Sequence, residues 1–329
     1  MPPRSLLALA VLLTPSLARV SAPPSALGPW PVAEASYNVS TLDGTDPSIW
    51  LVYPVCNNTA TACPLFPLIS YAHGMAGGDI DLLAYASHFY RLASWGFVVA
   101  APDSCDVGCT DASGGAPWTN CAGLPDVQPA LWPAWYGEQL KAIDWARNQS
   151  AGGSSDAVFS TIDWEAGVGI AGHSMGGQAT ALSASAACAR AWGIRAAVLH
   201  HNANGNVTGG GNVGVNISVP IAAFTSDGDS IWPETMQMMA AFNTSAAADT
   251  LPSVLRDVVG FSHLEPLLAP PIENPLLATY TAAFFKVFLN GDRGEFYDAI
   301  YGGSGPSSLC GHAPMADCYT RNAPQAGGG

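Results

Sequence analysis

The segment Val168-Gly-Ile-Ala-Gly-His-Ser-Met-Gly-Gly177 decides the fold expected for this chain. It joins a short apolar strand to a helix of small residues, with Ser174 at the apex of a Gly-x-Ser-x-Gly turn. So sharp a turn strains the serine backbone and holds its Oγ clear of the sheet, while Gly172 and Gly176 let strand and helix approach. The short pattern also occurs by chance, but here a strand precedes it and a helix follows. We therefore expect Ser174 to be a nucleophile that attacks a carbonyl carbon.

Strand patterns and helix patterns alternate on both sides of this turn. Residues 23–48 predict an irregular arm plus an edge strand. Apolar runs, continuous or alternating, predict further strands at 48–55, 65–72, 97–101, 168–171, 196–199, 219–225 and, as the last, 254–259. Apolar residues at helical spacing predict helices at 82–95, 134–148, 177–191 and 274–289. This alternation predicts an α/β fold, with a mainly parallel central sheet and helices on both faces, in a single domain spanning 23–329.

Residues 1–22 are expected to be a signal peptide outside that domain. Arg4 gives a positive start, Leu6 to Leu13 is a short apolar run, and Val20-Ser-Ala22 offers small residues for cleavage. The run is shorter than the about twenty residues that cross a bilayer, and we expect no stable membrane span. An uncleaved anchor or a plastid transit peptide is the alternative. We expect the protein to be secreted or to reside in the lumen of the secretory pathway.

Sequons and cysteines agree with such a route. Asn-x-Ser/Thr begins at Asn38, Asn57, Asn148, Asn206, Asn216 and Asn243. The 8 cysteines form an even set, as an oxidising compartment favours. Cys56 with Cys63, and Cys310 with Cys318, are plausible pairs, and Cys188 is a candidate for a buried free thiol. The absence of a Cys-x-x-Cys pair argues against a zinc ribbon.

Charge narrows the choice of partner. With 25 acidic and 11 basic residues the formal net charge is −14, and no basic run occurs. Nucleic acid and anionic membrane surfaces are poor partners for such a chain, so we expect a neutral or apolar substrate. No spacing unites histidines with carboxylates as a metal site, and we expect neither metal nor cofactor. We expect the protein to be a monomer.

Two later loops supply partners for the serine. A serine hydroxyl needs a base to take its proton and an acid to orient that base. His263 follows the last predicted strand and is expected to be the base. Asp227 and Asp229 both follow the strand before it, and from the residues alone either could be the acid while the other caps the loop. The order Ser, Asp, His, with each residue on a loop after a strand, is similar to that of the α/β hydrolases.

The remaining site residues are expected around the reacting carbonyl. Backbone N–H groups of Met175 and of Met75, in a glycine-rich turn after an early strand, would form an oxyanion hole. That turn lacks the lysine of a phosphate-binding loop. Segment 103–133 holds three cysteines and little periodicity, and predicts a long disulfide-rich loop near the site. Substrate contacts are expected from Trp132, Trp232 and His200, although packing or loop hydrogen bonds are the alternative roles.

At these motifs the chain resembles the α/β-hydrolase superfamily, and most of all its cutinase-like polyester hydrolases, which are dienelactone hydrolase-like, with chlorophyllases as relatives. Gly172-His-Ser-Met-Gly-Gly177 matches the polyester hydrolases' elbow, and Gly260-Phe-Ser-His263 resembles their Gly-Ala-Ser-His. Ser94-Trp-Gly-Phe-Val-Val99 is similar to a Ser-His-Gly-Phe-Val-Val segment of both groups. Asp229-Ser-Ile-Trp-Pro233 resembles the acid loop Asp-Thr-Ile-Ala-Pro, which implies that Asp229 is the acid.

The chain also departs from these families. His73-Gly74 stands where the polyester hydrolases have Pro-Gly, and Met175 stands where chlorophyllases usually have Arg. The resemblance covers about residues 50 to 290. It implies a serine carboxylic-ester hydrolase that acts through an acyl-enzyme, but it does not carry over the substrate. With the expected signal peptide, we expect a secreted enzyme that acts on a small-molecule or polymeric ester. A chlorophyllase that releases phytol, or a non-catalytic glycosylated binding protein on the same fold, is the alternative.

Overall fold

A computed structural model gives the structure of the chain. It describes residues 26–39, 48–56, 63–74, 83–103, 133–202, 217–231, 250–268, 276–303, 305, 308–312 and 315–326. The expected signal peptide and the expected disulfide-rich loop, apart from its ends, lie outside the described residues. In the described part of the chain, no helix has both the length and the apolar character needed to cross a bilayer.

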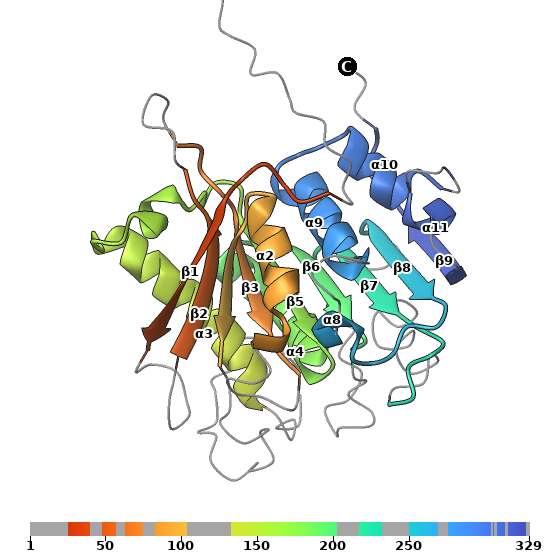
Figure 1. Ribbon diagram of the computed structural model, residues 1–329, viewed down its shortest axis with the longest axis horizontal. Coiled ribbons are helices and arrows are strands. Elements are labelled where there is room, and N and C mark those ends of the chain that lie inside the picture. The colour runs from red at the N-terminus through yellow and green to blue at the C-terminus, as the bar shows by residue number, and fades with distance from the viewer. Residues whose placement is uncertain are drawn as a thin grey trace, which may run out of the picture.

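Nine strands form one twisted sheet in the order β1-β2-β4-β3-β5-β6-β7-β8-β9 (Figure 1). The strands are β1 (Val32–Asn38), β2 (Ser48–Pro54), β3 (Leu68–Ala72), β4 (Val98–Pro102), β5 (Val168–His173), β6 (Ile194–His200), β7 (Ile221–Thr225), β8 (Ser253–Val258) and β9 (Met315–Arg321). The six strands from β4 to β8 in this order are parallel, and the pairs at the two edges are antiparallel. The predicted α/β class and mainly parallel sheet are therefore confirmed.

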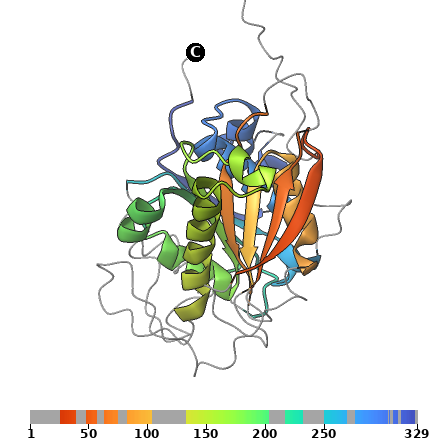
Figure 2. The ribbon, with the colours of Figure 1, turned by 90° about the vertical axis from the view of Figure 1, so that its left-hand side faces the viewer.

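Helices cover both faces of the sheet (Figure 2). One face carries α3 (Pro133–Ala151), α4 (Met175–Ser183) and α5 (Ala186–Trp192), and the other carries α2 (Ala86–Ser94) and α9 (Leu276–Leu289). Shorter helices are η1 (Ala157–Thr161), α8 (Glu265–Leu268), α10 (Glu295–Tyr301) and α11 (Leu309–His312).

Alternation along each central strand divides the core into two layers. Successive strand side chains point to opposite faces. Leu68 of β3 accordingly packs in the layer beneath α3 and α4, and the next residue, Ile69, packs in the layer beneath α2 and α9. Both side chains are fully buried, and each contributes roughly 2 kcal/mol to folding. A sheet buried on both faces explains why these strands read as continuous apolar runs.

The structure corrects two sequence expectations about elements. The helix predicted at 177–191 is two helices, because the carbonyl of Ala184 accepts a hydrogen bond from the N–H of Ser218 at 2.9 Å, and Ser185 forms a β-bridge with Ile217. Strand β8 is not the last, since β9 pairs with it antiparallel. Strand β9 escaped prediction because it is a largely exposed edge strand of polar sequence.

The cysteines also differ in part from expectation. The predicted Cys310–Cys318 disulfide is present and links α11 to β9. Cys56 and Cys63, the other expected pair, are free thiols, and burial is the main reason that the pKa of Cys63 is raised to about 11. Cys188 is disulfide-bonded, so its interpretation as a buried free thiol was wrong.

Candidate active site

Ser174 occupies the sharp turn between β5 and α4. Its φ is 56° and its ψ is −117°, a strained combination for a residue with a side chain. The turn depends on glycine, since a Cβ at Gly172 would collide with the carbonyl oxygen of Gly176, and a Cβ at Gly176 would collide with that of Ala72. The N–H of Ser174 donates to the carbonyl of His200 at 2.9 Å, which fixes the turn to β6.

Three side chains far apart in sequence form a hydrogen-bonded chain at the carboxyl edge of the sheet. Oγ of Ser174 lies 2.9 Å from Nε2 of His263, and Nδ1 of His263 lies 2.8 Å from Oδ2 of Asp229. These distances are those of good hydrogen bonds. All three residues are buried, with relative exposures of 5 to 6%. The structure thus brings together the three residues expected to act on a carbonyl.

The two aspartates in the loop after β7 have different surroundings. Asp229 is buried, and its Oδ1 accepts the N–H of Ile231 at 2.9 Å while Oδ2 faces His263. Asp227 is exposed and accepts the N–H of Gly260 at 2.7 Å. Asp227 therefore links two loops, and Asp229 is the carboxylate that contacts the imidazole.

A second chain of hydrogen bonds, through Tyr85 and His173, links the loops that surround Ser174 and His263. Tyr85 accepts the N–H of Gly74 at 3.2 Å and lies 2.5 Å from Nδ1 of His173, to which its hydroxyl donates. Nε2 of His173 in turn donates to the backbone carbonyl of His263 at 2.7 Å. The glycine-rich turn at Gly74, the turn at Ser174 and the loop that carries His263 are therefore connected through two buried side chains.

Of the two backbone groups expected to form an oxyanion hole, the structure describes one. Met175 is the first residue of α4, so its backbone N–H has no partner within the helix and can face a developing oxyanion. Met75 lies outside the described residues. Its neighbour Gly74 lies against the serine, because a Cβ at that glycine would be 3.5 Å from Cβ of Ser174.

The residues expected to bind substrate are placed as follows. Trp132 and Trp232 lie outside the described residues. His200 is fully buried, and its ring nitrogens lie 3.3 Å from Oη of Tyr71 and 2.8 Å from Oγ1 of Thr281. His200 therefore links β6 to α9 by a hydrogen bond. Its buried side chain has this structural role in place of the expected contact with substrate.

The surroundings of the site favour neutral imidazoles. Burial lowers the pKa of His73 to about 4 and, with the charge of Arg91 adding to the effect, that of His88 to about 3. Burial is also the main reason that the pKa values of His173 and His200 lie well below their usual range. An environment that disfavours buried positive charge makes each hydrogen bond near the serine stronger than it would be in water.

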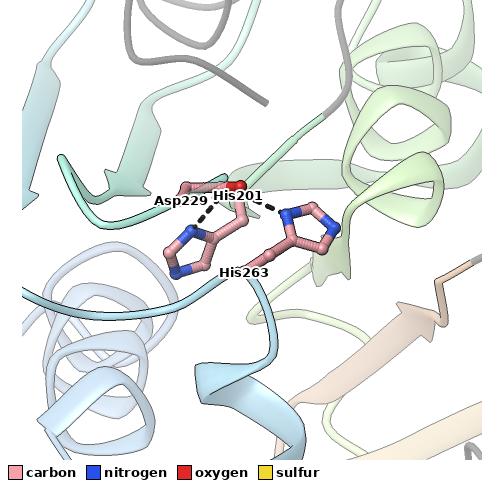
Figure 3. A group of neighbouring side chains, drawn as sticks. All are labelled: His201, Asp229 and His263. Carbon is pink, nitrogen blue, oxygen red and sulfur yellow. Dashed lines mark hydrogen bonds and ion pairs between the residues drawn. The ribbon is translucent and has the colours of Figure 1, made fainter. Parts of the chain in front are cut away.

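His201 is the residue at this site that the sequence analysis did not assign. Its Nδ1 lies 3.1 Å from Oδ2 of Asp229, the same oxygen that faces His263 (Figure 3). In the sequence it is the second of two histidines that end a strand, and for both the alternatives were substrate contact and loop hydrogen bonds, with no bond to the acid expected.

His201, Asp229 and His263 also form a group whose ligand atoms lie within 4.8 Å of one another. Ligand atoms around a tetrahedral zinc at about 2.0–2.1 Å lie roughly 3.3 Å apart. Both nitrogen–oxygen distances, 3.1 and 2.8 Å, are shorter than that and match hydrogen bonds. A proton on each nitrogen therefore accounts for both contacts.

Comparison with known proteins adds no relative to this picture. The chain matches no protein-family model, and no curated protein matches its sequence. The interpretation of the site therefore depends on its geometry and chemistry.

Proposed function

We propose that this protein is a serine carboxylic-ester hydrolase with an α/β-hydrolase fold. The observation that carries the proposal is the chain Ser174–His263–Asp229, with 2.9 and 2.8 Å between its reacting atoms, built on a serine of positive φ. The nucleophile follows β5, the acid follows β7 and the base follows β8, which is the chain order typical of that superfamily.

In the proposed reaction Oγ of Ser174 attacks the ester carbonyl carbon while its proton passes to Nε2 of His263. Asp229 holds the imidazole in the required tautomer and stabilises the imidazolium that forms. The N–H of Met175 donates to the oxyanion of the tetrahedral intermediate. His263 then gives its proton to the departing alkoxide, and the acyl group remains on the serine. Water, deprotonated by His263, releases the acid in a second passage through the same steps.

An apolar substrate is proposed from the surroundings of the triad. Ile231 and Leu264, two residues and one residue from triad members, are 54% and 42% exposed. Large apolar side chains exposed beside a reactive group favour binding of an apolar acyl or alcohol group. The net charge of −14 also favours a neutral ester over an anionic one.

We also propose that the protein follows the secretory route. The proposal is supported by the composition of residues 1–22 and by the exposure of two sequon asparagines, Asn38 and Asn148, which can accept a glycan at the surface.

A serine-reactive probe tests the catalytic proposal. Wild-type protein should hydrolyse p-nitrophenyl butyrate and should be labelled by a fluorophosphonate at Ser174, located by mass spectrometry of the labelled peptide. Ser174→Ala should lose both properties and keep its melting temperature, whereas Ser230→Ala, an exposed serine of the acid loop, should keep both. Turnover that persists in Ser174→Ala would contradict the role of Ser174 as nucleophile. A wild type inert to both reagents would contradict the proposal as a whole and favour a binding protein.

A further inference from the structure

Four side chains at the carboxyl edge of the sheet come from four neighbouring strands. Ser174 follows β5, His201 follows β6, Asp229 follows β7 and His263 follows β8, which is also the order of these strands in the sheet. The proposed reaction uses three of them and leaves His201 without a role. His201 is fully buried, and Figure 3 shows its imidazole and that of His263 turned toward one carboxylate.

The chemistry of the carboxylate assigns the protons in this group. An ionised carboxylate only accepts hydrogen bonds, so each imidazole that faces Oδ2 of Asp229 presents a protonated Nδ1. Burial lowers the pKa of His201, although the hydrogen bond to Asp229 opposes that shift. The other titratable rings near it belong to His263 and His173, at centroid distances of 5.9 and 6.3 Å. His201 is therefore a neutral imidazole that donates through Nδ1.

The second nitrogen separates the two imidazoles that share Asp229. Nε2 of His263 lies 2.9 Å from Oγ of Ser174 and can take its proton. Nε2 of His201 is buried and has no hydrogen-bond partner within the described parts of the chain. The proton of Ser174 can therefore pass to His263. In the part of the chain that the structure describes, His201 has no contact of this kind and can affect His263 only through their shared partner, Asp229.

The backbone of His201 is held in a costly conformation. Its φ is 45°, and among the described residues only Ser174 and Asn322 share a positive φ without being glycine. The N–H of His201 donates to the carbonyl of Phe224 at 2.8 Å, which extends the β6–β7 pairing by one residue and fixes the strained position. Strain that the surrounding sheet enforces next to a reactive group is typical of functional positions.

We propose that His201 is a positioning residue of this hydrolase, which donates a second hydrogen bond to Oδ2 of Asp229 and so holds the carboxylate in the orientation that aims His263 at the serine. The inference rests on the proposed function, because positioning matters only if the triad reacts. A carboxylate held by the N–H of Ile231 at Oδ1 and by His201 at Oδ2 has little freedom to rotate away from His263.

The test compares variants that keep or remove the donor at this position. Asparagine can place an amide N–H near the site of Nδ1 and tolerates positive φ, so His201→Asn keeps the donor. His201→Leu removes the donor and fills similar space, and His201→Gly removes it without backbone strain. Active sites are titrated with a fluorophosphonate so that kcat counts folded molecules, and kcat and KM are measured with p-nitrophenyl butyrate.

We expect kcat of the Leu and Gly variants to fall about tenfold, as loss of a hydrogen bond to a charged group predicts, with KM within about twofold of wild type. His201→Asn should recover kcat to within about threefold. His88→Asn changes another buried imidazole, whose ring packs against Tyr71 and His200, and should leave kcat per titrated site unchanged.

Three results would overturn the inference. The first is kcat within twofold of wild type in both donor-free variants. The second is an Asn variant as slow as the Leu variant. The third is activity that EDTA abolishes and zinc restores, which would make the group a metal site. If the fluorophosphonate fails to label wild-type protein, the proposed function falls together with this inference, whereas a labelled wild type with indifferent His201 variants rejects the inference alone.

Discussion

Exchange of each loop aspartate for asparagine separates the proposed acid from its neighbour. Asp229→Asn keeps the shape of the side chain but removes the charge that faces the imidazolium. At an effective dielectric constant of about 20, unit charges roughly 4 Å apart attract by about 4 kcal/mol. If that attraction stabilises the transition state, its loss lowers kcat by about 10³-fold, because about 1.4 kcal/mol corresponds to a factor of ten.

Asp227→Asn is the matched control. Asp227 is exposed, and its Oδ1 accepts the N–H of Gly260, which the amide oxygen of asparagine can also accept. We expect kcat to stay within twofold of wild type. Both variants are compared by steady-state hydrolysis of p-nitrophenyl butyrate, with thermal unfolding as a check on the fold. An Asp229→Asn enzyme within tenfold of wild type, or an equal loss in Asp227→Asn, would refute the assignment of the acid.

Three further perturbations test the supports of the site. Gly172→Ala should lower the free energy of unfolding by about 3 kcal/mol, measured by denaturant titration, because its Cβ collides with the carbonyl of Gly176; an unchanged midpoint would contradict this. Tyr85→Phe removes the hydroxyl that joins two loops and should lower kcat about tenfold with little change in KM, and unaltered kcat would count against this connection. Stability should decrease in acid. His73 and His88 have folded pKa values of about 4 and about 3, below the ordinary value of 6.5, so the folded state binds fewer protons. The stability that these neutral histidines contribute is therefore fully present above pH 6.5 and is lost as the pH falls toward 4, by about 3 kcal/mol for His73. A flat profile of unfolding free energy against pH would reject this.

The sharp turn at Ser174 could be predicted because its requirements are local. A strand that reverses into a helix within one residue needs glycine on both sides, and that need appears in the sequence as Gly172 and Gly176. The buried parallel strands could be predicted for a similar reason, since burial on both faces leaves continuous apolar runs. Strand β9 carries no such signal, because an exposed edge strand is specified by its partner β8 more than by its own residues.

The choice between Asp227 and Asp229 could not be made from the residues alone. Both follow the same strand and each lies between a glycine and a serine, so the local pattern does not separate them. Their difference comes from the neighbouring loop, where Gly260 donates a hydrogen bond to Asp227 and His263 donates one to Asp229. The two contacts together hold the β7 and β8 loops in register.

The roles of His200 and His201 differ because consecutive side chains at the end of a strand point in different directions. Because strand side chains alternate, consecutive residues at a strand end face different surroundings, and the sequence does not state which one faces the site. His200 turns toward α9 and bonds to Thr281, while His201 turns toward Asp229. The turn at His201 requires a positive φ, which no residue pattern here predicts because histidine is not glycine. A strained backbone was expected at Ser174 from its glycines. The second strained residue belongs to the same group of side chains, and for that reason it merits the same test of function.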